Sequence, residues 1–225
     1  MFLRAENISK KYYRPTKNAS HFEAVKPLNF ALEPGTLTEI TGRSGSGKST
    51  LLYMLAGLLK PSTGKVFVDE TDLYLLKDDS LSKFRNQKIG VIPQGQTGLF
   101  ALTVLQNVLA PASIYGDSKN FENRARELLE QVGISHLSES KMTELSGGEM
   151  RRMAIARALI MNPEIIFADE PTDDLDDENT RGVLELLQQT AKTGKCVLLV
   201  THESSAADYA DKIYRMDAGE LKTIA

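Results

Sequence analysis

Short apolar runs alternate with amphipathic segments along most of the chain. Runs rich in β-branched and other apolar residues predict strands, and they lie at residues 2–8, 24–32, 36–41, 65–68, 89–92, 165–168 and 196–200. The last of these runs is apolar at every position, which is typical of a strand covered on both faces. The end of the chain, residues 212–224, predicts two further strands around a turn at residues 217–219.

Helical periodicity is clearest between Phe121 and Val132, and Gly133 follows at the position where glycine commonly ends a helix. Further helices are predicted at residues 49–59, 149–161 and 177–192, whereas the polar segment 14–22 predicts a loop. Because strands and helices alternate, the chain is expected to form an α/β fold. No linker divides the sequence, so residues 1–225 are expected to form a single domain.

Composition and charge exclude several classes of protein. The chain has 225 residues, of which 41% are hydrophobic and 25% charged, and its formal net charge is -3. A nucleic-acid-binding protein usually has a strong basic excess, so no nucleic-acid partner is expected. The single cysteine, Cys196, excludes a disulfide scaffold. No signal peptide is expected, and the most apolar run, Leu51 to Leu59, is too short to span a bilayer, so no transmembrane domain is expected either.

A phosphate-binding loop follows the predicted strand 36–41. The segment fits the pattern G-x-x-x-x-G-K-[ST], in which glycines let backbone N–H groups approach phosphate oxygens, the lysine reaches the β- and γ-phosphates, and the hydroxyl can ligate Mg²⁺. A glycine- and serine-rich loop without a ligand is the alternative, but the strand before it and the helix after it favour a phosphate site. The candidate residues are Gly42, Arg43, Ser44, Gly45, Ser46, Gly47, Lys48, Ser49 and Thr50.

A second candidate anion site precedes the predicted helix 149–161. Leu145 and Glu149 flank Ser146, Gly147 and Gly148, whose backbone amides and hydroxyl could meet phosphate at a helix N-terminus. Taken alone, such a sequence is more often an N-cap with a flexible turn.

Together the two motifs resemble those of the ABC-type ATPase family, and the resemblance covers nearly the whole chain. It implies a P-loop NTPase fold of the ABC ATPase type, with a RecA-like core, an antiparallel β subdomain and an α-helical subdomain at roughly residues 95–160. It also implies hydrolysis of ATP with Mg²⁺ and a homodimer in which the Leu-Ser-Gly-Gly-Glu signature of one copy, residues 145–149, closes over the nucleotide on the other copy's P-loop.

The resemblance assigns roles to further residues. Asp169, together with Ser49 and Gln94, would hold Mg²⁺, while Glu170 would polarise the attacking water and Lys48 and His202 would contact phosphate. Asp176 matches the D-loop aspartate. Tyr12 matches the aromatic residue that stacks on adenine, and Tyr13 is the alternative.

Residues 84–94, 102–108 and 167–172 are similar to the subgroup of lipoprotein-release, macrolide-export and cell-division ATPases. This implies a subunit on the cytoplasmic, inner face of the cell membrane that drives a separate integral-membrane permease. A regulator that gates a membrane partner without moving cargo and an importer subunit are the alternatives, whereas the absence of long insertions disfavours an ABC ATPase acting on DNA or ribosomes. The chain departs from the subgroup at two places. In the D-loop it has Asp173-Asp174, where the subgroup usually has Gly-Asn. After the signature glutamate it has Met150-Arg151, where the subgroup usually has two glutamines.

An uncharged stretch of 27 residues, Ile89 to Tyr115, is unusual in a chain with this charge content. Interface cores are depleted in charge, so the stretch predicts either a surface for the membrane partner or simple burial. Arg151 and Arg152, in contrast, are expected on a solvated helix face.

Overall fold

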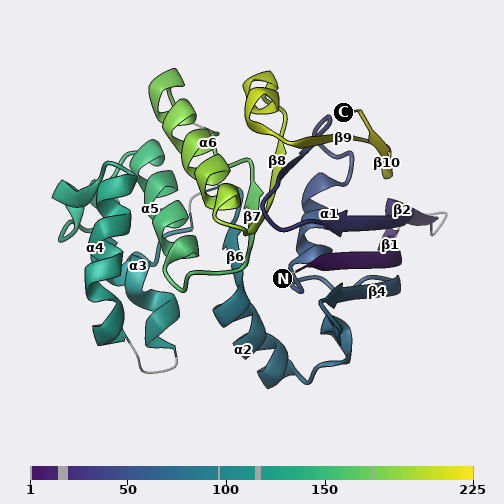
Figure 1. The fold of residues 1–225 in the computed structure, drawn as a ribbon, viewed down its shortest axis with the longest axis horizontal. Coiled ribbons are helices and arrows are strands. Elements are labelled where there is room, and N and C mark those ends of the chain that lie inside the picture. The colour runs from purple at the N-terminus through teal and green to yellow at the C-terminus, as the bar shows by residue number, and fades with distance from the viewer. Residues whose placement is uncertain (1, 15–19, 96, 115–117, 174, 225) are drawn as a thin grey trace.

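The computed structural model describes residues 2–14, 20–95, 97–114, 118–173 and 175–224, and shows two sheets with helices between and beside them (Figure 1). The strands are β1 (Leu3–Arg14), β2 (Ser20–Leu32), β3 (Leu37–Thr41), β4 (Thr63–Val68), β5 (Thr71–Asp72), β6 (Ile89–Ile92), β7 (Ile165–Asp169), β8 (Cys196–Thr201), β9 (Lys212–Asp217) and β10 (Glu220–Thr223). The α-helices are α1 (Lys48–Leu55), α2 (Asp78–Lys88), α3 (Val104–Ser113), α4 (Glu122–Gln131), α5 (Gly147–Leu159) and α6 (Asp177–Lys192). Short 3-10 helices are η1 (Leu73–Leu75), η2 (Ser118–Phe121), η3 (Ser135–Leu137), η4 (Met142–Glu144) and η5 (Ser204–Tyr209).

The two sheets differ in topology. One has four antiparallel strands in the order β2-β1-β4-β5. The other has six strands in the order β10-β9-β3-β8-β7-β6 and is parallel except for the terminal β9–β10 hairpin. The carboxyl ends of parallel strands lie at one edge of a sheet, so the loops after β3, β7 and β8 meet there, as expected for ligand binding in α/β proteins.

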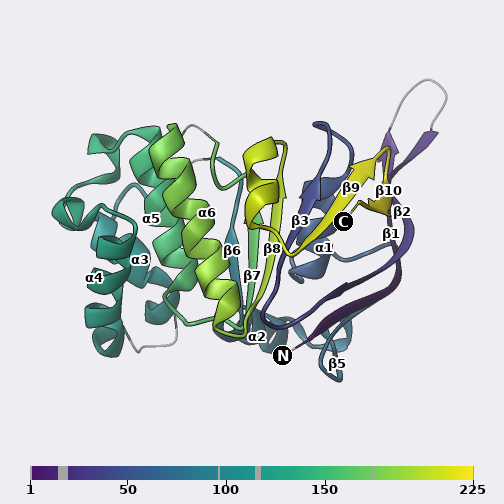
Figure 2. The same cartoon turned by 45° about the horizontal axis from the view of Figure 1, so that its top comes forward.

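Two apolar clusters lie on opposite faces of the six-stranded sheet. One packs α1 against both sheets, with Leu51 and Leu55 beside Leu198 and Val200 of β8. The other packs α3 to α6 against the opposite face, with Leu199 of β8 among its members. Figures 1 and 2 show α3, α4 and α5 side by side, and both α5 and α6 pack on the sheet, α5 against β6 and α6 against β3 and β8. Successive residues of β8 therefore enter different clusters, which explains why this strand is apolar at every position.

Most predicted elements are confirmed, but some bounds are wrong. The predicted helix 49–59 ends earlier, at Leu55, because the chain turns at Gly57, whose φ is 69°. The predicted loop 14–22 is partly strand: β1 continues to Arg14 and β2 begins at Ser20, since the two strands pair along their length, while residues 15–19 lie outside the described residues. Helices α2 and α3 were not predicted by the periodicity.

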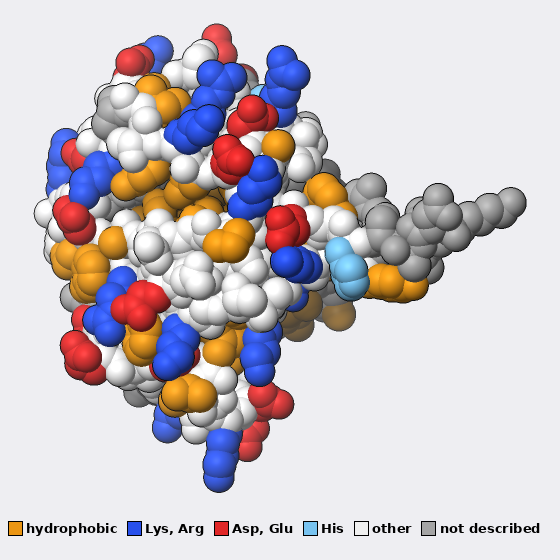
Figure 3. All heavy atoms as spheres, turned by 90° about the vertical axis from the view of Figure 1, so that its right-hand side faces the viewer, with side chains coloured by type: hydrophobic (Ala, Val, Ile, Leu, Met, Phe, Trp, Pro, Cys, Tyr) orange, Lys and Arg blue, Asp and Glu red, His pale blue; other side chains and the backbone are white. Residues whose placement is uncertain are grey.

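None of the described helices combines the length and apolar character needed to cross a bilayer. Figure 3 shows the face that lies on the right of Figure 1, where basic and acidic side chains are interspersed with separate small apolar patches. This face therefore presents no field of one sign of charge.

Candidate functional site

The loop between β3 and α1 requires glycine at two positions because the backbone of other segments approaches it closely. A Cβ atom on Gly42 would lie 2.3 Å from the Met216 carbonyl oxygen, and one on Gly47 would lie 2.2 Å from the Ala24 carbonyl oxygen. Gly47 also has a φ of 109° and directly precedes the first residue of α1, Lys48. The loop is thus packed against β2 and β9 with its N–H groups at a helix N-terminus, as a phosphate cradle requires.

A cavity of about 620 Å³ opens over this loop. It brings together most of the residues predicted from the sequence, and its lining is Tyr12, Phe22, Ala24, Arg43, Ser44, Gly45, Gly47, Lys48, Ser49, Thr50, Gln94, Glu170 and His202. Of the two candidate tyrosines, Tyr12 lines the cavity, whereas Tyr13 is outside it and packs edge-on against His21. The geometry therefore favours Tyr12 for contact with a flat ring.

Lys48 is buried with its charge aimed at backbone oxygens. Its Nζ donates to the carbonyls of Gly42 at 2.7 Å and Arg43 at 3.3 Å, and lies 3.7 Å from Oε1 of Glu170. Only 6% of the residue is exposed. The ammonium is therefore held inside the phosphate loop.

Asp169 at the end of β7 has the features of a metal ligand. It is fully buried; its Oδ1 accepts a hydrogen bond of 2.9 Å from Ser49 Oγ, and its Oδ2 has no hydrogen-bond partner among the described residues. Burial raises the pKa of Asp169, and the Ser49 hydrogen bond opposes that effect. An orphaned carboxylate oxygen beside a serine hydroxyl fits a hard divalent cation such as Mg²⁺, which prefers oxygen ligands.

Tyr53 lies near Asp169 and was not predicted from the sequence. Burial, followed by the negative charge of Asp169, raises the pKa of Tyr53 to about 12. Nothing in the sequence indicates this neighbour, because Tyr53 belongs to α1 and Asp169 to β7.

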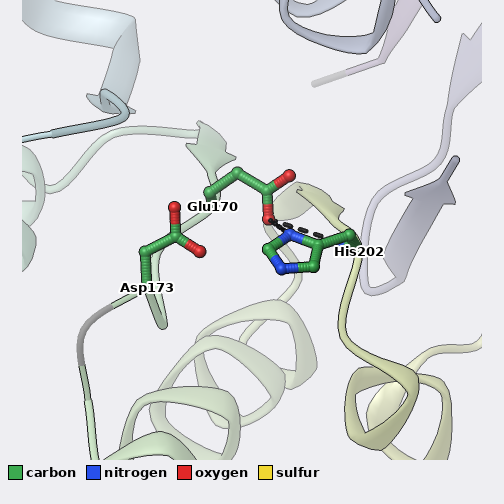
Figure 4. Close-up of side chains that lie close together, drawn as sticks. All are labelled: Glu170, Asp173 and His202. Carbon is green, nitrogen blue, oxygen red and sulfur yellow. Dashed lines mark hydrogen bonds and ion pairs between the residues drawn. The ribbon is translucent and has the colours of Figure 1, made fainter. Parts of the chain in front are cut away.

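Glu170 and His202 form a pair at the edge of the cavity (Figure 4). Oε2 of Glu170 accepts from the backbone N–H of His202 at 3.2 Å and lies 3.0 Å from its Nδ1. The backbone of Glu170 has a φ of 47°, a conformation rare for non-glycine residues and frequent at functional sites. Asp173 points toward the same pair, and one ligand atom from each of the three residues lies within 4.8 Å of the others.

Gln94 is exposed, lines the cavity and follows β6 and Pro93. The expectation of a solvated face for Arg151 and Arg152 is wrong. Arg151 is only 4% exposed, and its Nη1 donates to the Pro93 carbonyl at 2.8 Å. Arg152 donates to Asn179 Oδ1 at 2.6 Å. These arginines face inward because α5 packs between the loop after β6 and the start of α6.

The signature residues do not line the cavity of their own chain. Ser146 is the N-cap of α5, where its Oγ accepts from the N–H of Glu149 at 3.3 Å and donates to Glu149 Oε2 at 2.8 Å. Asp176 is likewise the N-cap of α6 and accepts from the N–H of Asn179 at 2.8 Å. Neither these two residues nor Gly147 and Gly148 are among the cavity lining.

The uncharged stretch, Ile89 to Tyr115, is partly buried and partly exposed. Val104, Leu105 and Val108 of α3 are buried, whereas Leu99 and Ile114 are 50% and 68% exposed; Tyr115 lies outside the described residues. A groove of about 690 Å³, here called the α3 groove, is lined by Leu99, Leu102, Gln106, Leu109, Ala110, Pro111, Ser113, Ile114, Ser118 and Arg157.

Comparison with known proteins agrees with this geometry. The family profile described as ABC transporter matches residues 25–173. The chain is 40% identical over 200 residues to the lipoprotein-releasing system ATP-binding protein LolD of Leptospira interrogans, covering 88% of this chain and 83% of that protein. It is 38% identical over 221 residues to LolD of Saccharophagus degradans, covering 97% and 96%.

Among solved structures, the dimeric post-hydrolysis state of the ATP-binding cassette MJ0796 bound to ADP and Pi superposes with a TM-score of 0.90 and 33% identity, covering 99% of each chain. A second dimeric structure of MJ0796, described as a bacterial ABC transporter cassette, matches equally well. Since the family profile covers more than half of the chain and the relatives align over most of it, the chain belongs to the ABC transporter family as an ATP-binding subunit and is an ATPase.

Proposed function

We propose that this chain is the ATPase subunit of a membrane complex of the lipoprotein-releasing type, acting as a Mg²⁺-dependent homodimer on the cytoplasmic side of its membrane partner. The names of its relatives support the class of cargo, and the dimeric structures of MJ0796 support the assembly. A regulator that moves no cargo and an importer subunit remain the competing functions.

The chemistry follows from the positions of the side chains. Mg²⁺ bound by Ser49, Asp169 and Gln94 would neutralise phosphate charge. Lys48 binds the β- and γ-phosphates, and Tyr12 stacks on the adenine. Glu170 orients the attacking water and accepts its proton, while His202 contacts the γ-phosphate and holds the Glu170 carboxylate in place through their 3.0 Å contact.

One observation carries the proposal of a dimer. Ser146, Gly147 and Gly148 stand at the N-terminus of α5, a ready anion site, yet they are absent from the lining of their own chain's nucleotide cavity. A second copy can bring its α5 terminus to that cavity, so each complete site uses the P-loop of one copy and the signature of the other.

Mixing two inactive variants tests this sharing. Lys48→Ala destroys the P-loop, and Ser146→Arg blocks the signature, so each variant alone is expected to lose ATPase activity. A mixed dimer retains one site with an intact P-loop and an intact signature, so part of the activity returns on mixing. If each chain used its own signature, no mixture would recover activity. Lys48→Ala mixed with Glu170→Gln, both defective in the same half-site, is the matched control and stays inactive.

The membrane partner is proposed to dock in the α3 groove. The groove combines exposed apolar side chains with an absence of charge along α3, which is typical of an interface core. Leu99 and Ile114 line it at 50% and 68% exposure, more than burial alone would leave.

The docking proposal is tested with tagged Glu170→Gln protein, which is expected to bind ATP, dimerise stably and hydrolyse slowly. Proteins that co-purify from detergent-solubilised membranes are identified by mass spectrometry, and Ile114→Asp is expected to abolish their capture. Leu75→Asp, at an apolar side chain 78% exposed outside the groove, is the matched control.

The identity of the captured protein separates the candidate functions. A partner with few spans and a large extracytoplasmic domain supports the lipoprotein-releasing type, whereas a permease with many spans supports an importer. Capture that is insensitive to Ile114→Asp contradicts the docking site.

A further inference from the structure

Two arginines of α5 hold the loop after β6 on either side of Gln94. Nη1 of Arg151 donates to the Pro93 carbonyl at 2.8 Å, one residue before Gln94. Nη1 and Nη2 of Arg157 donate to the carbonyl and Oγ1 of Thr97, both at 2.7 Å, three residues after it. The loop that carries Gln94 is therefore attached to one helix at both ends.

The Arg151 contact is unusual in its burial. A guanidinium keeps its charge at all ordinary pH values, and burying a charge is costly unless it is well hydrogen-bonded. Arg151 is 4% exposed, and no carboxylate of the described residues forms an ion pair with it. Its charge is instead directed at the Pro93 carbonyl, in a charge-assisted hydrogen bond that is stronger than a neutral one.

We propose that Arg151 is a positioning residue that fixes the backbone at Pro93, so that the Gln94 side chain faces the nucleotide cavity. Because Ser146 is the N-cap of the same helix, Arg151 also ties the position of Gln94 to the signature end of α5. Arg151 lies five positions after Ser146, a rise of about 7.5 Å along the helix. The expected effect of Arg151 on ATPase activity rests on the proposed role of Gln94 as a Mg²⁺ ligand.

Hydrogen–deuterium exchange of the nucleotide-free protein tests the attachment directly. In Arg151→Gln, the peptide containing Gln94 is expected to exchange at least about threefold faster, since a hydrogen bond from a charged donor is lost. Peptides from the P-loop and α4 stay unchanged. Arg126→Gln removes the same charge from an exposed ion pair with Glu122 on α4 and is the matched control. Unchanged exchange around Gln94 in Arg151→Gln overturns the proposal, whatever the role of Gln94.

Steady-state kinetics test the consequence. At saturating ATP, Arg151→Gln is expected to raise the free Mg²⁺ concentration for half-maximal ATPase activity about three- to tenfold, with little change in the KM for ATP. Arg151→Lys, which keeps a donor, is expected to recover part of the loss. Should the glutamine variant not fold, Arg151→Met, which also removes the charged donor, takes its place in both measurements.

A double-mutant cycle with Gln94→Ala separates this inference from the proposed function. If Arg151 acts through Gln94, adding Arg151→Gln to Gln94→Ala has little further effect on the Mg²⁺ requirement. Independent, multiplying effects would show that Arg151 acts elsewhere and overturn the positioning role. If Gln94→Ala alone leaves the Mg²⁺ requirement unchanged, the proposed role of Gln94 fails, while the exchange experiment still decides whether Arg151 holds the loop.

Discussion

Two buried carboxylates, Asp169 and Glu39, each have an oxygen without a hydrogen-bond partner among the described residues. Their surroundings indicate different roles. Asp169 lies beside Ser49 and the phosphate loop, so a cation can complete its ligands. Glu39 lies within β3, between Leu199 of β8 and Ile213 of β9, and is 2% exposed. Since Glu39 is not among the residues that line the nucleotide cavity, its burial is expected to cost stability without serving the reaction.

The cost of Glu39 predicts a pH dependence of stability. Burial raises the pKa of Glu39 from 4.5 to about 7, so the folded protein holds a proton there that the unfolded chain has already released. The free energy of unfolding therefore falls as pH rises from about 4.5 through about 7, by roughly 3–4 kcal/mol at 1.4 kcal/mol per pH unit. Urea unfolding between pH 5 and pH 8 measures this fall.

Glu39→Gln removes the titrating group and is expected to flatten that part of the profile. Glu70→Gln, an exposed carboxylate on the same protein, is the control and should reproduce the wild-type slope. Equal slopes in wild type and Glu39→Gln would show that Glu39 is ionised in the folded protein at pH 5.

At the scale of elements, the loop before α3 is held by one buried amide. Asn107 is fully buried; its Oδ1 accepts from the N–H of Leu99 at 2.7 Å, and its Nδ2 donates to the carbonyls of Leu99 at 3.1 Å and Thr103 at 2.9 Å. The side-chain amide thus hydrogen-bonds both the N–H and the carbonyl of Leu99, as the backbone of an adjacent strand would. It fixes where the exposed apolar residues of the α3 groove begin.

Replacing Asn107 by alanine is expected to lower the free energy of unfolding by about 2–4 kcal/mol, because it removes the acceptor of the Leu99 N–H and opens a cavity. Gln106→Ala, at an exposed capping-box position one residue away, is expected to cost only about 0.5–1 kcal/mol. Denaturant unfolding of both variants measures the difference. Similar losses in the two variants would contradict the anchoring role of Asn107.

How well each element could be predicted depends on where its stability originates. Helix α6 has the predicted bounds, Asp177–Lys192, since its acidic first turn and apolar stripe are both visible in the sequence. Helix α2 was missed because it buries only Leu81, and α3 because Pro111 lies within it. The phosphate loop is a local motif and was found, whereas the contacts of Arg151 and Tyr53 join distant segments and could not be derived from spacing.

At the scale of the whole molecule, the proposed shared site requires two copies of a negatively charged chain to approach each other. The net charge is -3, and residues 169–178 include seven carboxylates. Asp173 points toward the Glu170–His202 pair at the cavity edge, where the partner's signature is proposed to close (Figure 4). Like charges gathered at a closing interface oppose association, and salt weakens that opposition.

The acidic D-loop is therefore expected to weaken the ATP-bound dimer. In the Glu170→Gln background, Asp173→Gly with Asp174→Asn should strengthen ATP-dependent dimerisation at low salt by about three- to tenfold, corresponding to roughly 0.7–1.4 kcal/mol. The difference should shrink at about 1 M salt, where the screening length is about 3 Å. Sedimentation velocity across a salt series measures both. Glu127→Gln with Glu130→Gln removes the same charge from an exposed face of α4 and is the control. An equal gain in this control would assign the effect to net charge. A gain that persists at high salt would assign it to the conformation of the D-loop. Only a gain that is specific to the D-loop and weakened by salt supports repulsion at the closing site.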